Sequence, residues 1–263
     1  MGGGAPRRAH VLVHEPHRVQ PVPRKKKIRD AVFAVSISEV DREDVLARAG
    51  ERWRDKIHVV RCGIDLAAWS GLERRPEPGR ILSVGALREK KGHHVLVEAC
   101  ARLRDEGLDI HCEIVGEGPE RDRLERRIAE LDLGDRVRLL GALSPEETRE
   151  RYRRAELFVL ACVVAANGDL DGVPIVLMEA MMAGVPPVST RLSGIPELIE
   201  DATSGLLAEP GDAAGLAARM KRLRGDPALR ETMGRAATER AGRLCDASRN
   251  ALAMAELLRG ALP

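Results

Sequence analysis

Apolar runs of strand length alternate with amphipathic stretches of helix length over most of the chain after residue 79. Short apolar runs bounded by turn residues are typical of buried strands, and longer segments with apolar positions three or four apart are typical of helices. The pattern predicts strands at Ile81–Val84, His111–Val115, Val137–Leu140, Leu157–Ala161, Val185–Ser189 and Gly205–Ala208. It predicts helices at 91–106, 119–132, 145–153 and 174–183, with a helical chain after 212.

The regular alternation of strands and helices predicts an α/β fold with a doubly wound parallel sheet and helices on both faces. Ser144-Pro145-Glu146-Glu147 has the form of a helix start, and Gly134 follows the end of another helix. In such sheets ligands bind outside the carboxyl ends of the strands. Gly85 and the loop around Asp171 are both expected at that edge.

The first 76 residues follow a different pattern. Residues 1–30 are rich in Pro, Arg and Lys without periodicity, and include the basic run Arg24–Lys27. They are predicted to be irregular or disordered, with a nucleic-acid-binding tail as the weaker alternative. A strand at Ala31–Ile37, a helix at 39–49 and a strand at Ile57–Arg61 follow. One strand–helix–strand cannot enclose a core, so 31–76 is interpreted as the remnant of a larger N-terminal domain, and 77–263 as the main domain.

Composition narrows the class of function. Hydrophobic residues make up 44% and charged residues 32%, with a net charge of +2, so no strong field indicates nucleic acid or membrane. Aromatic residues are only 2%, which argues against single-stranded nucleic-acid binding by stacking. The five cysteines contain no CxxC pair, which favours free thiols in a reducing cytoplasm over a zinc site or a disulfide framework. Neither a signal peptide nor a transmembrane run is recognised.

The segment Asp171–Glu179 carries the clearest candidate chemistry. Pro174 is expected at the first helical position, which leaves the N–H groups of Gly172, Val173 and Ile175 facing the loop at the positive end of the helix dipole. That arrangement favours an anion such as phosphate. The carboxylate of Glu179, about 7 Å along the helix, would reach a second part of the same ligand. An anion cradle with two carboxylates fits a sugar nucleotide. The alternative is that the acids at 169 and 171 only cap the helix, and that Glu179 is an exposed helix acid.

Several segments together resemble the retaining glycosyltransferases of the GT-B class usually called family 4, and within it the bacterial exopolysaccharide enzymes of the colanic-acid type. The match extends over about 31–262 and rests on the order of its pieces. These are Ile57–Asp65, ending in Gly-Ile-Asp; Val84–Gly92; Val115–Pro119; Asp171–Glu179; Ser193–Glu197; and Gly205–Leu207.

The resemblance implies a UDP- or GDP-sugar donor bound by a Rossmann-like C-terminal domain. The sugar would pass with retention, and without a metal, to a glycan or lipid-linked acceptor in surface polysaccharide synthesis. Lys91 would meet the donor diphosphate and stabilise the leaving group. Asp171 would contact the transferred sugar and stabilise its developing positive charge, and Glu179 would bind the ribose hydroxyls. The other implied donor-binding residues are Gly85, Arg88, Leu140, Gly172, Val173 and Pro174.

Alternatives stay open for single residues. Lys91 could be a solvated surface lysine. Leu139 and Leu140 could be plain core positions, and Gly116 and Gly118 could only form a tight turn. Two positions depart from the family pattern. Ala86 stands where many members have Arg. Arg88 is the candidate to replace it, but it is expected to point the wrong way if the backbone stays extended. Pro187 stands where a strand residue is usual.

The resemblance also implies an N-terminal acceptor domain for which residues 1–30 leave little room. His14 and His17 are interpreted as solvated loop residues. The competing hypothesis is therefore a catalytically silent nucleotide-sugar-binding module. A dinucleotide-dependent oxidoreductase is disfavoured because Gly85–Gly92 lacks the GxGxxG pattern. An exposed interdomain face predicts self-association. A cytoplasmic protein is expected, with peripheral membrane association through the missing domain.

Overall fold

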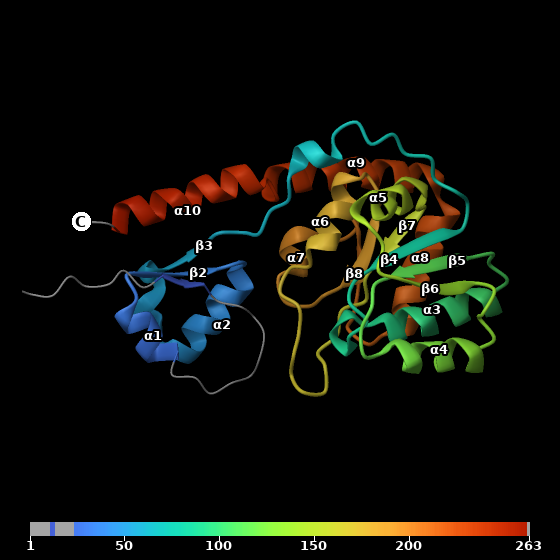
Figure 1. Cartoon of the computed structure of the whole chain (residues 1–263), viewed down its shortest axis with the longest axis horizontal. Helices are drawn as coiled ribbons and strands as arrows, with labels where there is room; N and C mark the ends of the chain where they lie inside the picture. The colour runs from blue at the N-terminus through green and yellow to red at the C-terminus, as the bar shows by residue number, and fades with distance from the viewer. Residues whose placement is uncertain (1–10, 14–23, 262–263) are drawn as a thin grey trace, which may run out of the picture.

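A six-stranded parallel sheet forms the centre of the molecule (Figure 1). The computed structural model describes residues 11–13 and 24–261. The strands are β4 Arg80–Val84, β5 His111–Val115, β6 Val137–Gly141, β7 Leu157–Val159, β8 Pro187–Thr190 and β9 Leu206–Ala208. Their spatial order is β6-β5-β4-β7-β8-β9, and every neighbouring pair is parallel. The predicted α/β fold with a doubly wound parallel sheet is thereby confirmed.

Helices cover both faces of this sheet, each over its own hydrophobic cluster. One face packs against α3 His93–Asp105, α4 Arg121–Glu130 and α8 Ala213–Gly225. The other packs against α5 Pro145–Arg154, α6 Ile175–Met182, α7 Ile195–Leu198 and most of α9 Pro227–Leu244. The last helix, α10 Ala247–Ala261, extends from this layer toward the N-terminal part of the chain (Figure 1).

Two local sequence signals have a clear structural outcome. The Ser144 hydroxyl accepts a hydrogen bond from the Glu147 N–H at 3.2 Å, and the Glu147 carboxylate accepts from the Ser144 N–H at 2.8 Å. This capping box starts α5 where the sequence predicts it. Pro187 is the first residue of β8, a position in which a proline does not interrupt the strand. The strand therefore begins two residues later than the predicted Val185.

A smaller parallel sheet precedes the larger one. Its strands are β1 Val11–Val13, β2 Phe33–Ser36 and β3 Ile57–Val59, in the order β1-β2-β3, with α1 Arg24–Asp30, α2 Glu39–Ala49 and a 3₁₀ segment at Glu51–Lys56 between them. Ile28, Leu46 and Ile57 lie in its buried core. We call this part the N-terminal unit, defined as residues 11–13 and 24–59.

The expectation that residues 1–30 are irregular is wrong for two stretches. Val11–Val13 pairs in register with Phe33–Val35, and Arg24–Asp30, which contains the basic run, is helical with Ile28 buried. Pairing with a strand about twenty residues away along the chain overrides the local Pro- and Arg-rich composition. His14 and His17 lie outside the described residues.

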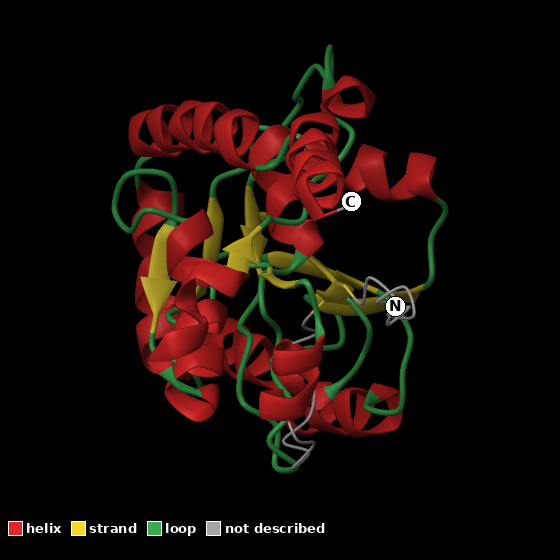
Figure 2. Cartoon of the chain, turned by 90° about the vertical axis from the view of Figure 1, so that its left-hand side faces the viewer, coloured by secondary structure: helices red, strands yellow, loops and turns green. Residues whose placement is uncertain are grey.

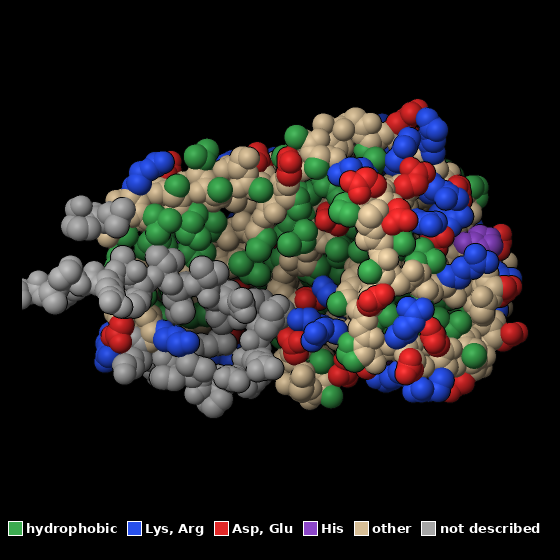
Figure 3. Space-filling model, in the orientation of Figure 1, with side chains coloured by type: hydrophobic (Ala, Val, Ile, Leu, Met, Phe, Trp, Pro, Cys, Tyr) green, Lys and Arg blue, Asp and Glu red, His purple; other side chains and the backbone are tan. Residues whose placement is uncertain are grey.

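One face of the small sheet is turned toward α10 and leaves a groove of about 1010 Å³. Val32, Phe33 and Val59 line it from the sheet, and Ala253 and Leu257 line it from α10. Figure 1 and Figure 2 show α10 above the small sheet, and Figure 3 shows apolar side chains gathered between them. No residue of α10 is buried. Within the described part of the chain, no helix has the length and apolar character needed to cross a lipid bilayer.

Candidate functional site

The candidate site lies at the carboxyl ends of β4 and β7, where the strand order of the sheet reverses. From the central strand β4 the chain adds β5 and β6 on one side, and then returns to add β7, β8 and β9 on the other. The loops after β4 and β7 consequently lead to opposite faces of the sheet, and the crevice between such loops is the usual ligand position in doubly wound sheets. The two loops are joined by a hydrogen bond from the Val163 N–H to the Lys90 carbonyl at 3.0 Å.

Two lysines from the first loop meet two aspartates from the second. Lys91 Nζ lies 2.8 Å from Asp171 Oδ2, and Lys90 Nζ lies 3.5 Å from Asp171 Oδ1 and 3.3 Å from Asp169 Oδ2. Asp171 is only 6% exposed, and its Oδ2 also accepts from the Cys162 thiol at 3.6 Å. Burial, together with the neighbouring Asp171 carboxylate, raises the pKa of Cys162 well above its usual range, so Cys162 stays a neutral donor.

This cluster decides between the alternative interpretations of Lys91, Asp169 and Asp171 that the sequence left open. The Lys91 side chain is 15% exposed and ion-paired, so it is not a solvated surface lysine. Helix α6 has Pro174 as its N-cap and no side-chain cap, so neither Asp169 nor Asp171 caps it. Pro174, expected as the first helical residue, is instead the N-cap, and α6 begins one residue later at Ile175.

The N-terminus of α6 is open. No described residue accepts a hydrogen bond from the backbone N–H of Gly172, Val173 or Ile175. Free N–H groups at the positive end of a helix dipole attract anions. These N–H groups directly follow Asp171, whose buried carboxylate is the partner of Lys91, and anion binding by them stays a prediction.

Glu179 lies one turn further along α6 and is half-buried. The Tyr152 hydroxyl from α5 donates to Glu179 Oε2 at 3.1 Å and lies at the same distance from the Val176 carbonyl oxygen. Burial raises the pKa of Glu179, while the Tyr152 hydrogen bond and the positive charge of Arg149 oppose this shift. Glu179 is thus not an exposed helix acid. Its Oε1 has no hydrogen-bond partner among the described residues and is free to accept from a ligand.

The loop after β4 holds the remaining predicted residues. The Gly85 N–H donates to the Val115 carbonyl at 2.9 Å, which ties the loop after β4 to the end of β5. Arg88 and Ala86 are both exposed while Leu87 between them is buried. The Arg88 N–H donates to the Ala86 carbonyl at 2.7 Å, so the backbone turns tightly here. The backbone is therefore not extended here, which was the condition for expecting Arg88 to point the wrong way, and a contact of Arg88 with the diphosphate stays a prediction.

Leu139 and Leu140 separate at the end of β6. Leu139 packs against the cluster under α3, and Leu140 packs against the cluster under α6. Leu139 is thus part of the core. The contact of Leu140 with a nucleotide base stays a prediction.

The sequence reasoning missed His93, which lies beneath the first loop and is 2% exposed. Its Nε2 lies 3.3 Å from the Gly85 carbonyl oxygen, and its Nδ1 lies 3.4 Å from Ser83 Oγ. Because a carbonyl only accepts, Nε2 carries the proton and Nδ1 accepts from the serine. Burial lowers the pKa of His93 to about 4, with a further lowering by Lys91, so the ring is neutral and fixes Gly85. Its position directly after Gly92, inside an apolar helix start, was the available signal.

Tyr152 and Lys90 were also missed. Tyr152 is the single tyrosine of the chain and lies fully buried at one end of α5, where its ring stacks on Phe158 at 5.6 Å. Lys90 sits next to the predicted Lys91. The Asp169-Leu170-Asp171 run, although it has the form of a metal motif, is partnered by these lysines. Among the residues that the structure describes, no group of three or more His, Cys, Asp or Glu is placed to hold a metal ion.

Comparison with known proteins gives a consistent result. The family model "Glycosyl transferases group 1" matches residues 70–240, more than half of the 263-residue chain. The amylovoran biosynthesis glycosyltransferase AmsK of Erwinia amylovora is 45% identical over 172 residues, which cover 64% of this chain and 42% of AmsK. The putative colanic acid biosynthesis glycosyltransferase WcaL of Escherichia coli is 41% identical over 169 residues, covering 64% of this chain and 42% of WcaL. The chain thus spans less than half the length of these curated relatives.

Solved structures share the fold over nearly the whole chain. A sucrose-phosphate synthase from Thermosynechococcus elongatus superposes with a TM-score of 0.75 at 27% identity, covering 90% of this chain and 60% of the synthase. HepE from Anabaena, solved in complex with UDP and glucose, superposes with a TM-score of 0.79 at 21% identity, covering 96% of this chain and 72% of HepE. The architecture described above is that of GT-B glycosyltransferases.

Proposed function

The chain belongs to the glycosyl transferases group 1 family, and on that basis we propose that it takes part in sugar transfer from a nucleotide-diphosphate-sugar donor during exopolysaccharide synthesis. The amylovoran and colanic acid enzymes among its relatives support the pathway class. The UDP complexes of HepE support a nucleotide-sugar donor. The acceptor in this proposal is a glycan or a lipid-linked sugar, and the configuration at the anomeric carbon is retained.

The observation that carries the proposal is the Lys91–Asp171 pair beside the open N-terminus of α6. In the protein without ligand the ammonium and the carboxylate neutralise each other at 2.8 Å. A donor diphosphate would bind the free N–H groups of the helix and compete with Asp171 for Lys91. The lysine would then stabilise the negative charge that grows on the departing nucleoside diphosphate.

Release from Lys91 would leave Asp171 free to act on the sugar. Its carboxylate would lie near the transferred sugar and stabilise the positive charge that develops at the anomeric carbon. Glu179 would bind the ribose hydroxyls through Oε1, because Tyr152 holds Oε2. Gly85 and Arg88 would contact the diphosphate region, and Leu140 the base of a UDP or GDP donor.

In this proposal the cationic groups of the site take the part that a divalent metal plays in other transferases. Lys91 and the N-terminus of α6 supply positive charge to the diphosphate. Adding EDTA is therefore expected to leave donor binding and turnover unchanged. A loss of turnover that Mg²⁺ or Mn²⁺ restores would contradict the metal-free mechanism.

Calorimetric titration with UDP-glucose and GDP-mannose tests the donor site. We expect Glu179→Ala and Lys91→Met each to weaken binding of the preferred donor by roughly 30-fold or more, since a hydrogen bond to a charged group contributes about 2 kcal/mol or more. Glu239→Ala is the matched control, because Glu239 is an exposed acid on α9. Affinity unchanged by Glu179→Ala would refute the assignment of the site.

A second candidate function is a nucleotide-sugar-binding module that does not catalyse transfer. It is motivated by Ala86, which stands in place of a diphosphate-binding arginine. The curated relatives are named as transferases, which favours the first proposal. Radiolabelled donor supplied with oligosaccharide or lipid acceptors separates the two, because a module binds donor without forming product. The cytoplasmic location and peripheral membrane association stay predictions.

A further inference from the structure

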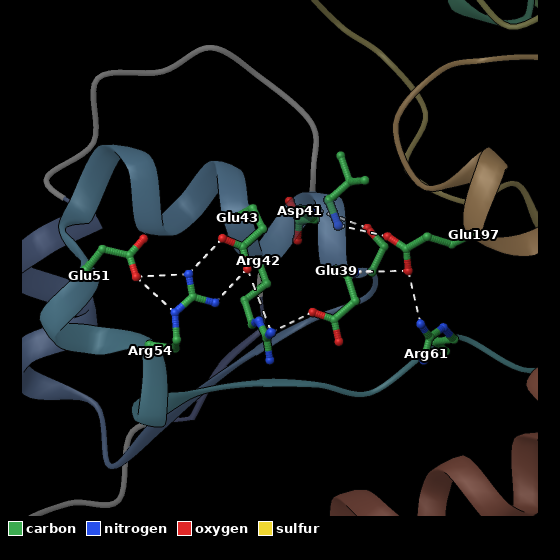
Figure 4. Close-up of polar contacts among 10 residues, drawn as sticks. Glu39, Asp41, Arg42, Glu43, Glu51, Arg54, Arg61 and Glu197 are labelled. Atoms are coloured by element: carbon green, nitrogen blue, oxygen red, sulfur yellow. Dashed lines mark hydrogen bonds and ion pairs between the residues drawn. The ribbon is translucent and has the colours of Figure 1, made fainter.

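The carboxylate of Glu197 joins the larger unit to the N-terminal unit (Figure 4). Its Oε1 accepts from the Val40 N–H at 2.8 Å, and its Oε2 accepts from the Glu39 N–H at 3.1 Å. Arg61, in the connection between β3 and β4, donates to the same Oε2 at 3.0 Å. The carboxylate comes from α7 in the larger unit, and the two N–H groups belong to the first turn of α2 in the N-terminal unit.

The α2 N-terminus depends on this contact. Its N-cap, Ser38, accepts only from the Asp41 N–H, at 3.1 Å. The N–H groups of Glu39 and Val40 would otherwise lack an acceptor in a contact region where the Glu197 side chain is 18% exposed. An anion at the positive end of a helix dipole, with hydrogen bonds to two free N–H groups, is a favourable charge-assisted arrangement. Glu197 thus completes a helix that lies more than 150 residues away in sequence.

Helix α7, which carries Glu197, also contacts the candidate donor loop, defined here as Asp171–Pro174. Gly194, the N-cap of α7, donates its N–H to the Gly172 carbonyl at 3.2 Å. A Cβ at Gly194 would lie 2.6 Å from Val173 Cγ2 and 2.9 Å from Ser38 Cβ. Ser38 and Val173 therefore both lie close against Gly194, where there is no room for a methyl group.

The space around this contact is almost filled. A cavity of about 10 Å³ lies between Arg61, Val173, Gly194 and Glu197. That volume holds at most one water molecule. A shift of the N-terminal unit relative to the larger unit cannot be absorbed here by empty space, so it must move Glu197, the donor loop or both.

We propose that Glu197 is a positioning residue that couples the docking of the N-terminal unit to the conformation of the donor loop. When the carboxylate holds α2, Ser38 packs against Gly194, and Gly194 in turn packs against Val173, donates to the Gly172 carbonyl and so keeps the N–H groups of the α6 N-terminus in place. When the contact opens, the donor loop loses this support. The coupling itself concerns only this chain's own segments, and its effect on donor affinity rests on the proposed function.

Hydrogen exchange without ligand tests the coupling directly. Glu197→Gln keeps the size of the side chain, but its amide nitrogen cannot accept from an N–H, so one of the two α2 donors loses its partner. We expect exchange at the first turn of α2 and in peptides covering 169–178 to rise about tenfold. Peptides covering β4 are expected to stay unchanged and show that the variant is folded.

Glu200→Gln is the matched control. Glu200 follows Glu197 by three residues and pairs with Arg240 at 2.9 Å, but its side chain is 56% exposed and contacts neither α2 nor the donor loop. Exchange in both regions should match the wild type. Arg61→Gln is the second variant, which removes the third partner of Glu197 and should raise exchange in both regions by a smaller factor.

Faster exchange in α2 with an unchanged donor loop would overturn the proposal, and so would unchanged exchange in α2. A second arm measures UDP affinity, which should weaken severalfold in Glu197→Gln and not in Glu200→Gln. If the wild type itself fails to bind UDP, the proposed function fails, while the ligand-free exchange result still decides the coupling.

Discussion

His93 illustrates how one buried side chain adds a pH dependence to this fold. The ring is neutral because burial lowers its pKa from 6.5 to about 4. Between these two values the unfolded chain binds a proton at this ring and the folded chain does not. Stability therefore rises with pH across that window, and a fall from pH 6.5 to about 4 removes about 3 kcal/mol at this site.

We expect His93→Gln to flatten the dependence of the free energy of unfolding on pH between 4 and 6.5. Urea denaturation at several pH values measures the slope for wild type and variant. His111→Gln is the control, since the His111 side chain is 51% exposed at the start of β5. Parallel curves for wild type and His93→Gln would contradict a neutral buried ring.

At the residue scale, the strand pattern predicted that the loop at Gly85 and the loop around Asp171 lie at one sheet edge, but it did not predict the ion pair between Lys91 and Asp171. Lys91 and Asp171 follow β4 and β7, and the rule for parallel sheets brings such loops together. Tyr152 could not be paired with Glu179 in this way, because their contact depends on how α5 packs beside α6. His93 and Glu197 likewise acquire their partners only from tertiary packing.

At the element scale, the turn between the first loop and α3 depends on the absence of a side chain. Gly92 has a φ of 66°, and a Cβ there would lie 1.7 Å from the Ala161 carbonyl oxygen. This close approach sets the position of the 3₁₀ turn Glu89–Lys91 against the chain that leaves β7. The placement of Lys91 opposite Asp171 thus depends on the backbone at Gly92.

Gly92→Ala is expected to lower the free energy of unfolding by about 3 kcal/mol or more and to weaken donor binding, because strain and collision add. Gly107→Ala provides the comparison. Gly107 also has a positive φ, of 78°, but a Cβ there meets nothing within 4 Å, so only about 1 kcal/mol of backbone strain is expected. Equal losses in the two variants would show that the collision with Ala161 is relieved at no cost.

The strands of the larger sheet were predictable because each buries an apolar run between turn residues. The ends of these strands were less predictable. Strand β7 stops at Val159 instead of Ala161, and β8 starts at Pro187 instead of Val185. The N-terminal unit was harder. β1 has three residues and is defined by its pairing with Phe33–Val35, which no local pattern reveals.

At the scale of the whole molecule, the connection from the N-terminal unit to the larger unit pairs with the segment that joins α9 to α10. The Ile64 N–H donates to the Cys245 carbonyl at 2.8 Å, and the Ala247 N–H donates to the Ile64 carbonyl at 3.1 Å. Asn250 donates to the Cys62 carbonyl at 3.3 Å. The connection is therefore a paired joint, and together with Glu197 it sets how α10 lies over the small sheet.

That joint holds α10 over the incompletely filled groove. We expect two copies of the chain to associate through this groove. Val32 is 41% exposed on the groove wall, and Leu257 faces it from a helix with no buried residue. Arg42, Arg54 and Glu256 supply charges of both signs around the apolar surface. Apolar area of this kind is stabilised by contact, and a second copy of the chain offers the same surface.

Light scattering and sedimentation at increasing concentration measure this association. Val32→Lys with Leu257→Lys should shift the midpoint of association to at least tenfold higher concentration, since each buried aliphatic side chain contributes about 1.5 kcal/mol or more. Val164→Lys is the control, because Val164 is 52% exposed but lies outside the groove. A wild-type chain that stays monomeric at all concentrations, or a control variant that dissociates equally, would show that the groove does not bind a second copy.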